Sequence, residues 1–221
     1  CKKVKLMKVY DTLTRQLKEI TVINRPLTMY VCGLTQYSPP HLGHAMKSIV
    51  FDVLRRYIEY SGVEVIHVEN ITDIDDKIIE AATENNTPIE ELTNKFSKIY
   101  NEDMLVLGVQ LPDLQPRATQ HIDKMINLIS NLIENDFAYF TNAHVLFSVK
   151  KYSNYGKLST RTQEEQIAGS RVEILEFKDD PADFVLWKPS EDDQPGWESP
   201  WGRGRPGWHI ECSAMSLKYL G

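Results

Sequence analysis

The sequence has few cysteines, no excess of positive charge and no long apolar run. Its 221 residues contain only Cys1, Cys32 and Cys212, too few for a disulfide framework and typical of a reducing compartment. Lysine and arginine total 25 against 31 aspartates and glutamates, and this net charge of −6 argues against a protein that coats nucleic acid unaided. No window approaches 18 apolar residues, which excludes a membrane span. We therefore expect a cytoplasmic protein without membrane partners.

The common nucleotide-binding and hydrolase motifs are also missing. The sequence contains no Gly-x-x-x-x-Gly-Lys-Ser/Thr phosphate loop, no Gly-x-Gly-x-x-Gly fingerprint and no Gly-x-Ser-x-Gly elbow. Residues 2–8 are basic but precede no apolar stretch, so we expect an exposed basic arm and no signal peptide. Any nucleotide site would then depend on the two-histidine segment at residues 41–44.

What is present predicts a βαβ unit over residues 27–70. Residues 27–32 form a short apolar run of strand-forming residues, and residues 63–68 form a second one. Between them, apolar residues recur at helical spacing and predict a helix over about 41–61 that ends at Gly62. Such units give parallel strands whose ligands bind at the carboxyl ends of the strands, and this edge is where Cys32 and Thr72 fall.

The rest of the chain predicts further helices and a region of short strands. Thr72 with Asp75 resembles an N-cap, followed by a first helical turn rich in carboxylates, and residues 87–90 resemble a capping box with proline at N1, opening a helix to about Leu107. The proline-rich linker near residue 116 is a candidate domain boundary, and an amphipathic helix begins near Thr119. Residues 138–141 and 145–149 predict short strands within an irregular subdomain.

Two groups of side chains could carry chemistry, and each also has an ordinary structural explanation. His41 and His44 lie at the start of a predicted helix, where free N–H groups suit a phosphate, although nearby histidines are more often incidental. Cys32 and Cys212 could bind zinc, which prefers thiolate and imidazole ligands, although a buried cysteine is ordinarily a small apolar side chain. Thr72, at a strand end, is the residue of its segment that suggests a ligand contact.

Six blocks of the sequence together resemble the catalytic domain of cysteinyl-tRNA synthetases, a family of class I aminoacyl-tRNA synthetases. The likeness covers residues 9–221, in order and without large gaps. The blocks are YVCGLT at 30–35, HLGH at 41–44, NITDIDDK at 70–77, PRAT at 116–119, DFVLWK at 183–188 and GRPGWHIECSAM at 204–215.

The resemblance implies an α/β fold with a Rossmann-type parallel sheet and an inserted connective subdomain. It divides the chain into a first half of the catalytic domain at 1–115, a connective insertion at 116–200 and a return to a truncated catalytic domain at 201–221. The implied reaction joins cysteine to ATP, with magnesium, and passes the cysteinyl group to tRNA(Cys). No side-chain nucleophile is required.

The resemblance also assigns residues to roles. His41 and His44 match the family's His-x-Gly-His signature and would be catalytic, binding ATP together with Gly43 and stabilising the developing charge. Cys32 and Cys212 match two zinc ligands, and the zinc would bind the substrate thiolate and so select cysteine over serine. A third group matches the cysteine pocket, namely Gly33, Thr72 and Trp208.

Some parts of the family pattern are not in these 221 residues. The family's other two zinc ligands, a histidine and a glutamate, follow this segment, as do the Lys-Met-Ser-Lys-Ser loop and the helical domain that reads the anticodon. We therefore expect a monomer that is inactive in aminoacylation by itself and that meets tRNA mainly through regions beyond residue 221. Two alternatives stay open: a ligase that joins cysteine to an amino sugar, as in mycothiol synthesis, and a non-catalytic paralogue that binds zinc or thiols.

Overall fold

The computed structural model describes residues 3–23, 26–159, 176–207 and 209–221, and it divides the chain into two compact units. Unit 1 comprises residues 1–8, 19–121 and 212–221, and unit 2 comprises residues 9–18 and 122–211. The predicted segment limits at 115/116 and 200/201 stay predictions. No helix among the described residues is both long and apolar enough to cross a membrane.

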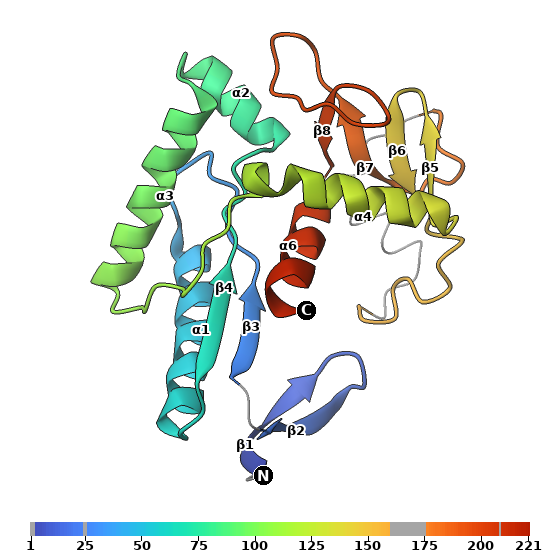
Figure 1. The fold of residues 1–221 in the computed structure, drawn as a ribbon. Helices are drawn as coiled ribbons and strands as arrows, with labels where there is room; N and C mark the ends of the chain where they lie inside the picture. The colour runs from blue at the N-terminus through green and yellow to red at the C-terminus, as the bar shows by residue number, and fades with distance from the viewer. Residues whose placement is uncertain (1–2, 24–25, 160–175, 208) are drawn as a thin grey trace. The chain divides into compact units, whose positions relative to one another are not determined.

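Unit 1 is built on a βαβ unit (Figure 1). Strand β3 (Leu27–Val31) pairs in parallel with β4 (Val65–Glu69), and helix α1 (Leu42–Tyr60) makes the connection between them. Gly62, at φ +80°, lies just past α1, as the sequence predicts for the residue that ends this helix. The parallel strand pair with its helices confirms the predicted α/β fold class.

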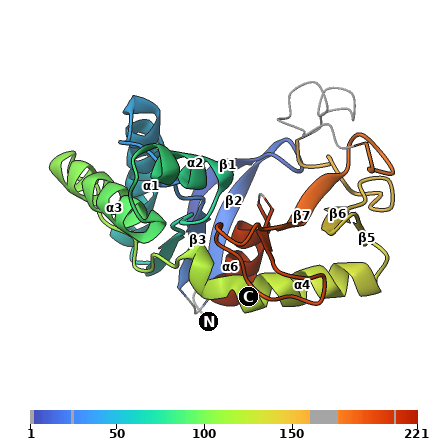
Figure 2. The same ribbon diagram turned by 90° about the horizontal axis from the view of Figure 1, so that it is seen from above.

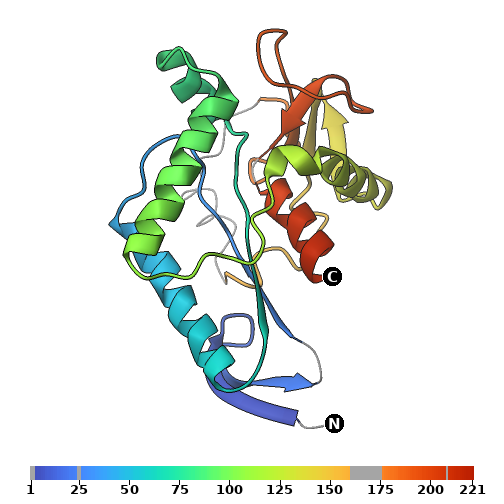
Figure 3. The same cartoon turned by 60° about the vertical axis from the view of Figure 1, so that its left-hand side comes forward.

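Three further helices and one helical turn also lie in unit 1. These are α2 (Asp76–Glu84), α3 (Ile89–Val106), the 3₁₀ turn η1 (Ala118–His121) and most of α6 (Ile210–Leu220). Helices α1 and α3 lie next to each other (Figure 3), where Ser48 Oγ and Tyr100 OH are 2.7 Å apart. The core consists of small apolar clusters, one of which joins Ile58 of α1 to Val63 and Val65.

Unit 2 contains a four-stranded antiparallel sheet in the order β5-β6-β7-β8. The strands are β5 (Ala138–Thr141), β6 (His144–Phe147), β7 (Phe184–Pro189) and β8 (Gly204–Pro206). Helix α4 (Ile122–Glu134) packs beside β5 (Figure 2), and Trp187 of β7 is fully buried. The sequence predicts β5 and most of β6 but not β7 or β8, because residues 184–206 hold prolines and glycines where a strand would show alternation.

Two predicted helix starts are wrong. Helix α2 begins at Asp76 and is capped by Asp75, whose side chain accepts the Lys77 N–H, so Thr72 is not its N-cap. Asp73 is not in the first turn either, since its carboxylate accepts the backbone N–H and the hydroxyl of Thr119, at 2.9 and 2.7 Å. The sequence alone placed the helix three residues too early, because several residues in succession could have capped it.

The other wrong start is that of α3, and the amino terminus forms a hairpin that was not predicted. The N-cap of α3 is Pro88, with no side-chain cap, and the Thr87 hydroxyl donates backwards to the Asn85 carbonyl. Residues 3–11 form strand β1 (Lys3–Asp11), which pairs with β2 (Gln16–Ile23), and the exposed basic arm expected at residues 2–8 stays a prediction. Alternation along β1 is weak, so the sequence gives little sign of a hairpin.

Candidate active site

The carboxyl ends of β3 and β4 lie side by side, because the two strands are parallel and in register from Leu27–Val65 to Val31–Glu69. The two segments that follow these strands also lie next to each other, since the Thr72 N–H donates to the Leu34 carbonyl at 3.3 Å. This geometry brings Cys32, Gly33 and Thr72 to one edge of unit 1, as the βαβ prediction required.

The two predicted zinc-binding cysteines meet at this edge. The Sγ atoms of Cys32 and Cys212 are 3.5 Å apart although 180 positions separate them in the chain. Cys212 lies in the first turn of α6, and neither cysteine is in a disulfide. A hydrogen bond with Cys212 lowers the pKa of the Cys32 thiol to about 7, burial opposes this, and the nearby Lys47 ammonium assists it. Cys32 is therefore a readily ionised thiol at neutral pH.

A partly buried charge network contacts the backbone of Cys32. Lys47 Nζ donates to the Cys32 carbonyl at 3.3 Å and to Glu69 Oε1 at 2.7 Å. The Tyr100 hydroxyl also donates to Glu69 Oε1, at 2.8 Å, and the pKa of Tyr100 is raised by burial and by the Glu69 charge. The Glu69 side chain is only 6% exposed, so its charge is neutralised inside unit 1 by Lys47. Neither Glu69 nor Tyr100 lies in a motif that predicts this network from the sequence.

Asn70 connects the predicted pocket residues to the thiol pair. Its Oδ1 accepts the Gly33 N–H at 2.9 Å and lies 3.7 Å from Cys212 Sγ, and its Nδ2 donates to Thr72 Oγ1 at 3.0 Å. Gly33 lies so close to β4 that a Cβ there would be 1.6 Å from the Asn70 carbonyl oxygen. Asn70 lies in the NITDIDDK block but was not predicted as a site residue, because the polarity of a single side chain gives no sign of its partners.

His41 and His44 cap the amino terminus of α1. His41 is the N-cap, its Nδ1 accepts the Gly43 N–H at 3.1 Å, and His44 Nδ1 accepts the His41 N–H at 3.2 Å. The rings stack with centroids 3.6 Å apart, and a Cβ at Gly43 would lie 3.0 Å from the His41 ring. A nitrogen that accepts an N–H carries no hydrogen, so each neutral ring holds its proton on Nε2. This capping role was not predicted from the sequence, because histidine is not among the preferred N-cap residues.

The electrostatics of the helix start favour neutral imidazole at His44. Its pKa is lowered by burial first, then by His41 and Lys47. Each ring can then present an Nε2–H donor at a helix terminus that already carries partial positive charge. Such an arrangement can bind an anion such as a phosphate.

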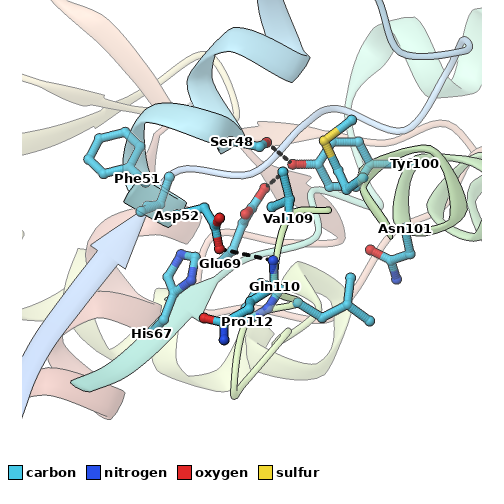
Figure 4. A pocket seen from close by; sticks show the side chains of 13 residues that line it. Ser48, Phe51, Asp52, His67, Glu69, Tyr100, Asn101, Val109, Gln110 and Pro112 are labelled. Atoms are coloured by element: carbon cyan, nitrogen blue, oxygen red, sulfur yellow. Dashed lines mark hydrogen bonds between the residues drawn. The ribbon is translucent and has the colours of Figure 1, made fainter. Parts of the chain in front are cut away.

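A small cavity lies within unit 1, apart from the predicted site residues (Figure 4). Its volume is about 10 Å³, which is about what one water molecule needs. Thirteen residues line it, among them Ser48, Asp52, His67, Glu69 and Tyr100. None of the predicted site residues is one of them. The cavity is too small for a substrate.

Two further parts of the predicted site are Trp208 and the complete set of zinc ligands. Trp208, predicted to line the cysteine pocket, lies outside the described residues. Among the described residues no group of three or more histidine, cysteine, aspartate or glutamate side chains could hold a metal ion. The thiol pair would therefore supply two ligands to a metal and would need others to complete a four-ligand site.

Comparison with known proteins gives one clear family. The model of the tRNA synthetases class I (C) catalytic domain matches residues 18–221. A protein of Maricaulis maris named cysteine--tRNA ligase is 51% identical over 216 residues, 96% of this chain and 47% of its own length. One of the same name from Parvibaculum lavamentivorans is 53% identical over 217 residues, 97% of this chain and 46% of its own. The chain thus spans about half the length of these relatives.

A solved structure shares the fold at low sequence identity. It is Mycobacterium tuberculosis methionyl-tRNA synthetase in complex with methionyl-adenylate, and it matches with a TM-score of 0.66 and 14% identity. The match covers 88% of this chain and 46% of that one. At this identity the likeness supports the fold alone.

Proposed function

The chain belongs to the class I (C) tRNA synthetases, the cysteinyl-tRNA synthetase family, and on this premise we propose that it activates cysteine with ATP for transfer to tRNA(Cys). The observation that carries the proposal is the convergence of Cys32 and Cys212, with sulfurs 3.5 Å apart, near Gly33 and Thr72, the residues expected to form the cysteine pocket. A thiol pair beside a substrate pocket suits an enzyme that must recognise a thiol.

We propose that Cys32 and Cys212 hold a zinc ion. Two sulfurs bound at about 2.3 Å in a tetrahedral site lie about 3.8 Å apart, so the observed separation of 3.5 Å needs little change. The low pKa of Cys32 favours the thiolate form that binds metals. When bound, zinc supplies a soft positive centre that lowers the pKa of a substrate thiol and discriminates against the harder hydroxyl of serine. The two further ligands that the family implies are not among these residues.

Other residues would bind the remaining parts of the substrates. Gly33, Thr72 and Trp208 would form the cysteine pocket. His41 and His44 would bind ATP with Gly43 at the start of α1, where their Nε2–H donors can bind the phosphates without reorganisation. Magnesium would accompany ATP. The cysteine carboxylate would then attack the α-phosphate and pyrophosphate would leave, as in the family.

We further propose a role for unit 2, a location for the tRNA contacts, and the compartment and oligomeric state of the protein. Unit 2, which comprises residues 9–18 and 122–211, would correspond to the connective insertion that the resemblance places at 116–200. A net charge of −6 supports tRNA contacts that lie mainly outside these 221 residues. We propose a cytoplasmic monomer.

Metal analysis of the purified chain tests the zinc proposal. Cys32→Ser is expected to abolish most of the bound zinc, because a hydroxyl is a poor substitute for a thiolate ligand. Cys1→Ser is the matched control and should keep the zinc of the unaltered chain. Equal zinc in all three proteins would remove Cys32 from the site.

Pyrophosphate exchange tests the activity. These 221 residues lack the family's Lys-Met-Ser-Lys-Ser loop, so exchange with cysteine, ATP and labelled pyrophosphate should be weak. Robust exchange would show that the loop is dispensable. Calorimetry with a cysteinyl-adenylate analogue completes the test: zinc retention without binding of the analogue would favour a non-catalytic paralogue.

A further inference from the structure

We propose that Asn70 is the positioning residue of this site, holding the thiol pair and the cysteine pocket in one arrangement through its side-chain amide. The inference rests on the proposed function for its biological meaning. The contacts of the Asn70 amide with Gly33, Thr72 and Cys212 can be tested without zinc or substrate.

The orientation of the Asn70 amide follows from its partners. The Gly33 backbone N–H can only donate, so the atom 2.9 Å from it must be the amide oxygen. The amide nitrogen then faces Thr72 Oγ1 at 3.0 Å and donates to it. One side chain thereby links the chain segment after β3 to the segment after β4.

This orientation also fixes the Thr72 hydroxyl. Because Thr72 Oγ1 accepts from Asn70 Nδ2, its own hydrogen remains to be donated elsewhere. A hydroxyl held as a donor can bind a carboxylate or another acceptor of a substrate. Asn70 thus sets the hydrogen-bonding direction of a predicted pocket residue without itself having to reach the substrate.

The same amide oxygen supports the thiol pair from two sides. It holds Gly33, the residue after Cys32, and lies 3.7 Å from Cys212 Sγ, within reach of a thiol hydrogen bond. Cys32 is held again through its carbonyl, which Lys47 contacts at 3.3 Å while paired with Glu69, the residue before Asn70. Residues 69 and 70 therefore fix the backbone around Cys32 by two independent contacts.

Burial and backbone pairing hold Asn70 in place, so its side chain can position the residues that it contacts. It is 1% exposed, and the backbone on either side pairs with a neighbouring segment, since the Glu69 N–H donates to the Leu114 carbonyl and the Ile71 N–H to the Pro116 carbonyl. A buried amide whose oxygen and nitrogen both have hydrogen-bond partners has few alternative rotamers. The position of its oxygen is therefore determined by β4.

The binding of a trivalent arsenical to both thiols depends directly on the distance between the two sulfurs. Phenylarsine oxide bonds to two nearby thiols: two arsenic–sulfur bonds form, and the oxygen leaves as water with both thiol protons. The experiment measures the dissociation constant of phenylarsine oxide in a Cys1→Ser background, where Cys32 and Cys212 are the remaining thiols. We compare Asn70→Ala, Asn70→Asp and a control, Asn101→Ala, which removes a part-buried asparagine that exchanges two hydrogen bonds with Gln115.

We expect Asn70→Ala to weaken arsenical binding about tenfold, the effect of one lost hydrogen bond on the placement of the sulfurs. Asn70→Asp keeps the acceptor for the Gly33 N–H and should recover binding to within about threefold. Asn101→Ala should match the background. Circular dichroism confirms that each variant is folded.

Two results would overturn the inference. One is equal binding by Asn70→Ala and Asn101→Ala, and the other is a background protein that does not bind the arsenical through both thiols. These outcomes are distinct from failure of the proposed function. If Asn70→Ala binds phenylarsine oxide as tightly as the background protein while the chain retains zinc, the result counts against the role of Asn70 alone. If the chain holds no zinc but Asn70→Ala still weakens arsenical binding, the result counts against the zinc proposal alone.

Discussion

His67 illustrates how a single buried group can set a pH dependence in this protein. It lies in β4, is 5% exposed, and neither of its ring nitrogens has a hydrogen-bond partner among the described residues. Burial is the largest cause of its lowered pKa; Glu69 and Asp113 oppose the shift, whereas Arg55 and Lys47 add to it. A lowered pKa means that protons bind the unfolded chain more readily than the folded one.

The sign of the effect follows from this difference. Above the unfolded pKa of about 6.5 both states hold neutral His67, and stability does not depend on it. As the pH falls below that value the unfolded chain gains the proton first, so the free energy of unfolding decreases. We expect His67→Phe to reduce the decrease in the free energy of unfolding between pH 7.5 and 5.5, measured by urea unfolding. An unchanged pH dependence would contradict this.

Gly33 gives a second prediction for a single residue. A Cβ at this position would lie 1.6 Å from the Asn70 carbonyl oxygen, so Gly33→Ala forces the two strand ends apart. We expect it to lower the free energy of unfolding by roughly 3 kcal/mol or more. The matched control is Gly62→Ala, where φ is +80° but a Cβ meets nothing within 4 Å, and where the cost should be about 1 kcal/mol. Equal losses in the two variants would show that Gly33 is not closely packed.

For helix α1, the cap and the proposed ATP site use the same two imidazoles but different nitrogens. The Nδ1 atoms of His41 and His44 accept backbone N–H groups, which leaves the Nε2–H donors available for a ligand. Substitutions can therefore separate the two roles. Asparagine caps helices well but has no equivalent of Nε2.

We expect His41→Ala to destabilise the chain by about 1 kcal/mol and His41→Asn to cost only a few tenths. Both variants should weaken ATP binding, because both lack the Nε2–H donor. Thermal unfolding measures the first effect and calorimetry with ATP the second. If His41→Asn bound ATP as well as the unaltered chain does, the imidazole would have no role beyond the cap.

In the whole molecule, the unfolding of each unit can be followed with a different probe. All four tryptophans fall within residues 187–208, so tryptophan fluorescence reports on unit 2, whereas the reactivity of Cys32 reports on unit 1. Asp183 is fully buried in unit 2, where it accepts the Val149 N–H and the Tyr139 hydroxyl. Its loss leaves buried donors unsatisfied in that unit.

We therefore expect Asp183→Ala to lower the unfolding midpoint detected by fluorescence more than the midpoint detected by labelling of Cys32. The loss of free energy in unit 2 should be roughly 2–3 kcal/mol. Lys151→Ala is a suitable control, because it removes a surface ion pair of the same unit and should change little. Equal shifts of both midpoints in Asp183→Ala would show that the units unfold together.

Local sequence determined much of this protein's architecture. The predicted strand at 27–32 and helix at 41–61 correspond closely to β3 (Leu27–Val31) and α1 (Leu42–Tyr60), and the α/β fold class is confirmed. These features depend on periodic burial and on glycine at a positive φ, which are properties of a few consecutive residues. The family was also evident from six sequence blocks in order.

Only the tertiary structure decided which polar residues act on which partners. Asp75 rather than Thr72 caps α2, His41 and His44 cap α1, and Asn70 joins the two strand ends. The approach of Cys32 to Cys212 was implied by resemblance to the family but could not be derived from spacing. The reason is physical: a hydrogen bond or a thiol contact depends on distances of a few ångströms between segments, and these distances are set by packing of the whole unit, whereas periodicity depends on neighbours along the chain.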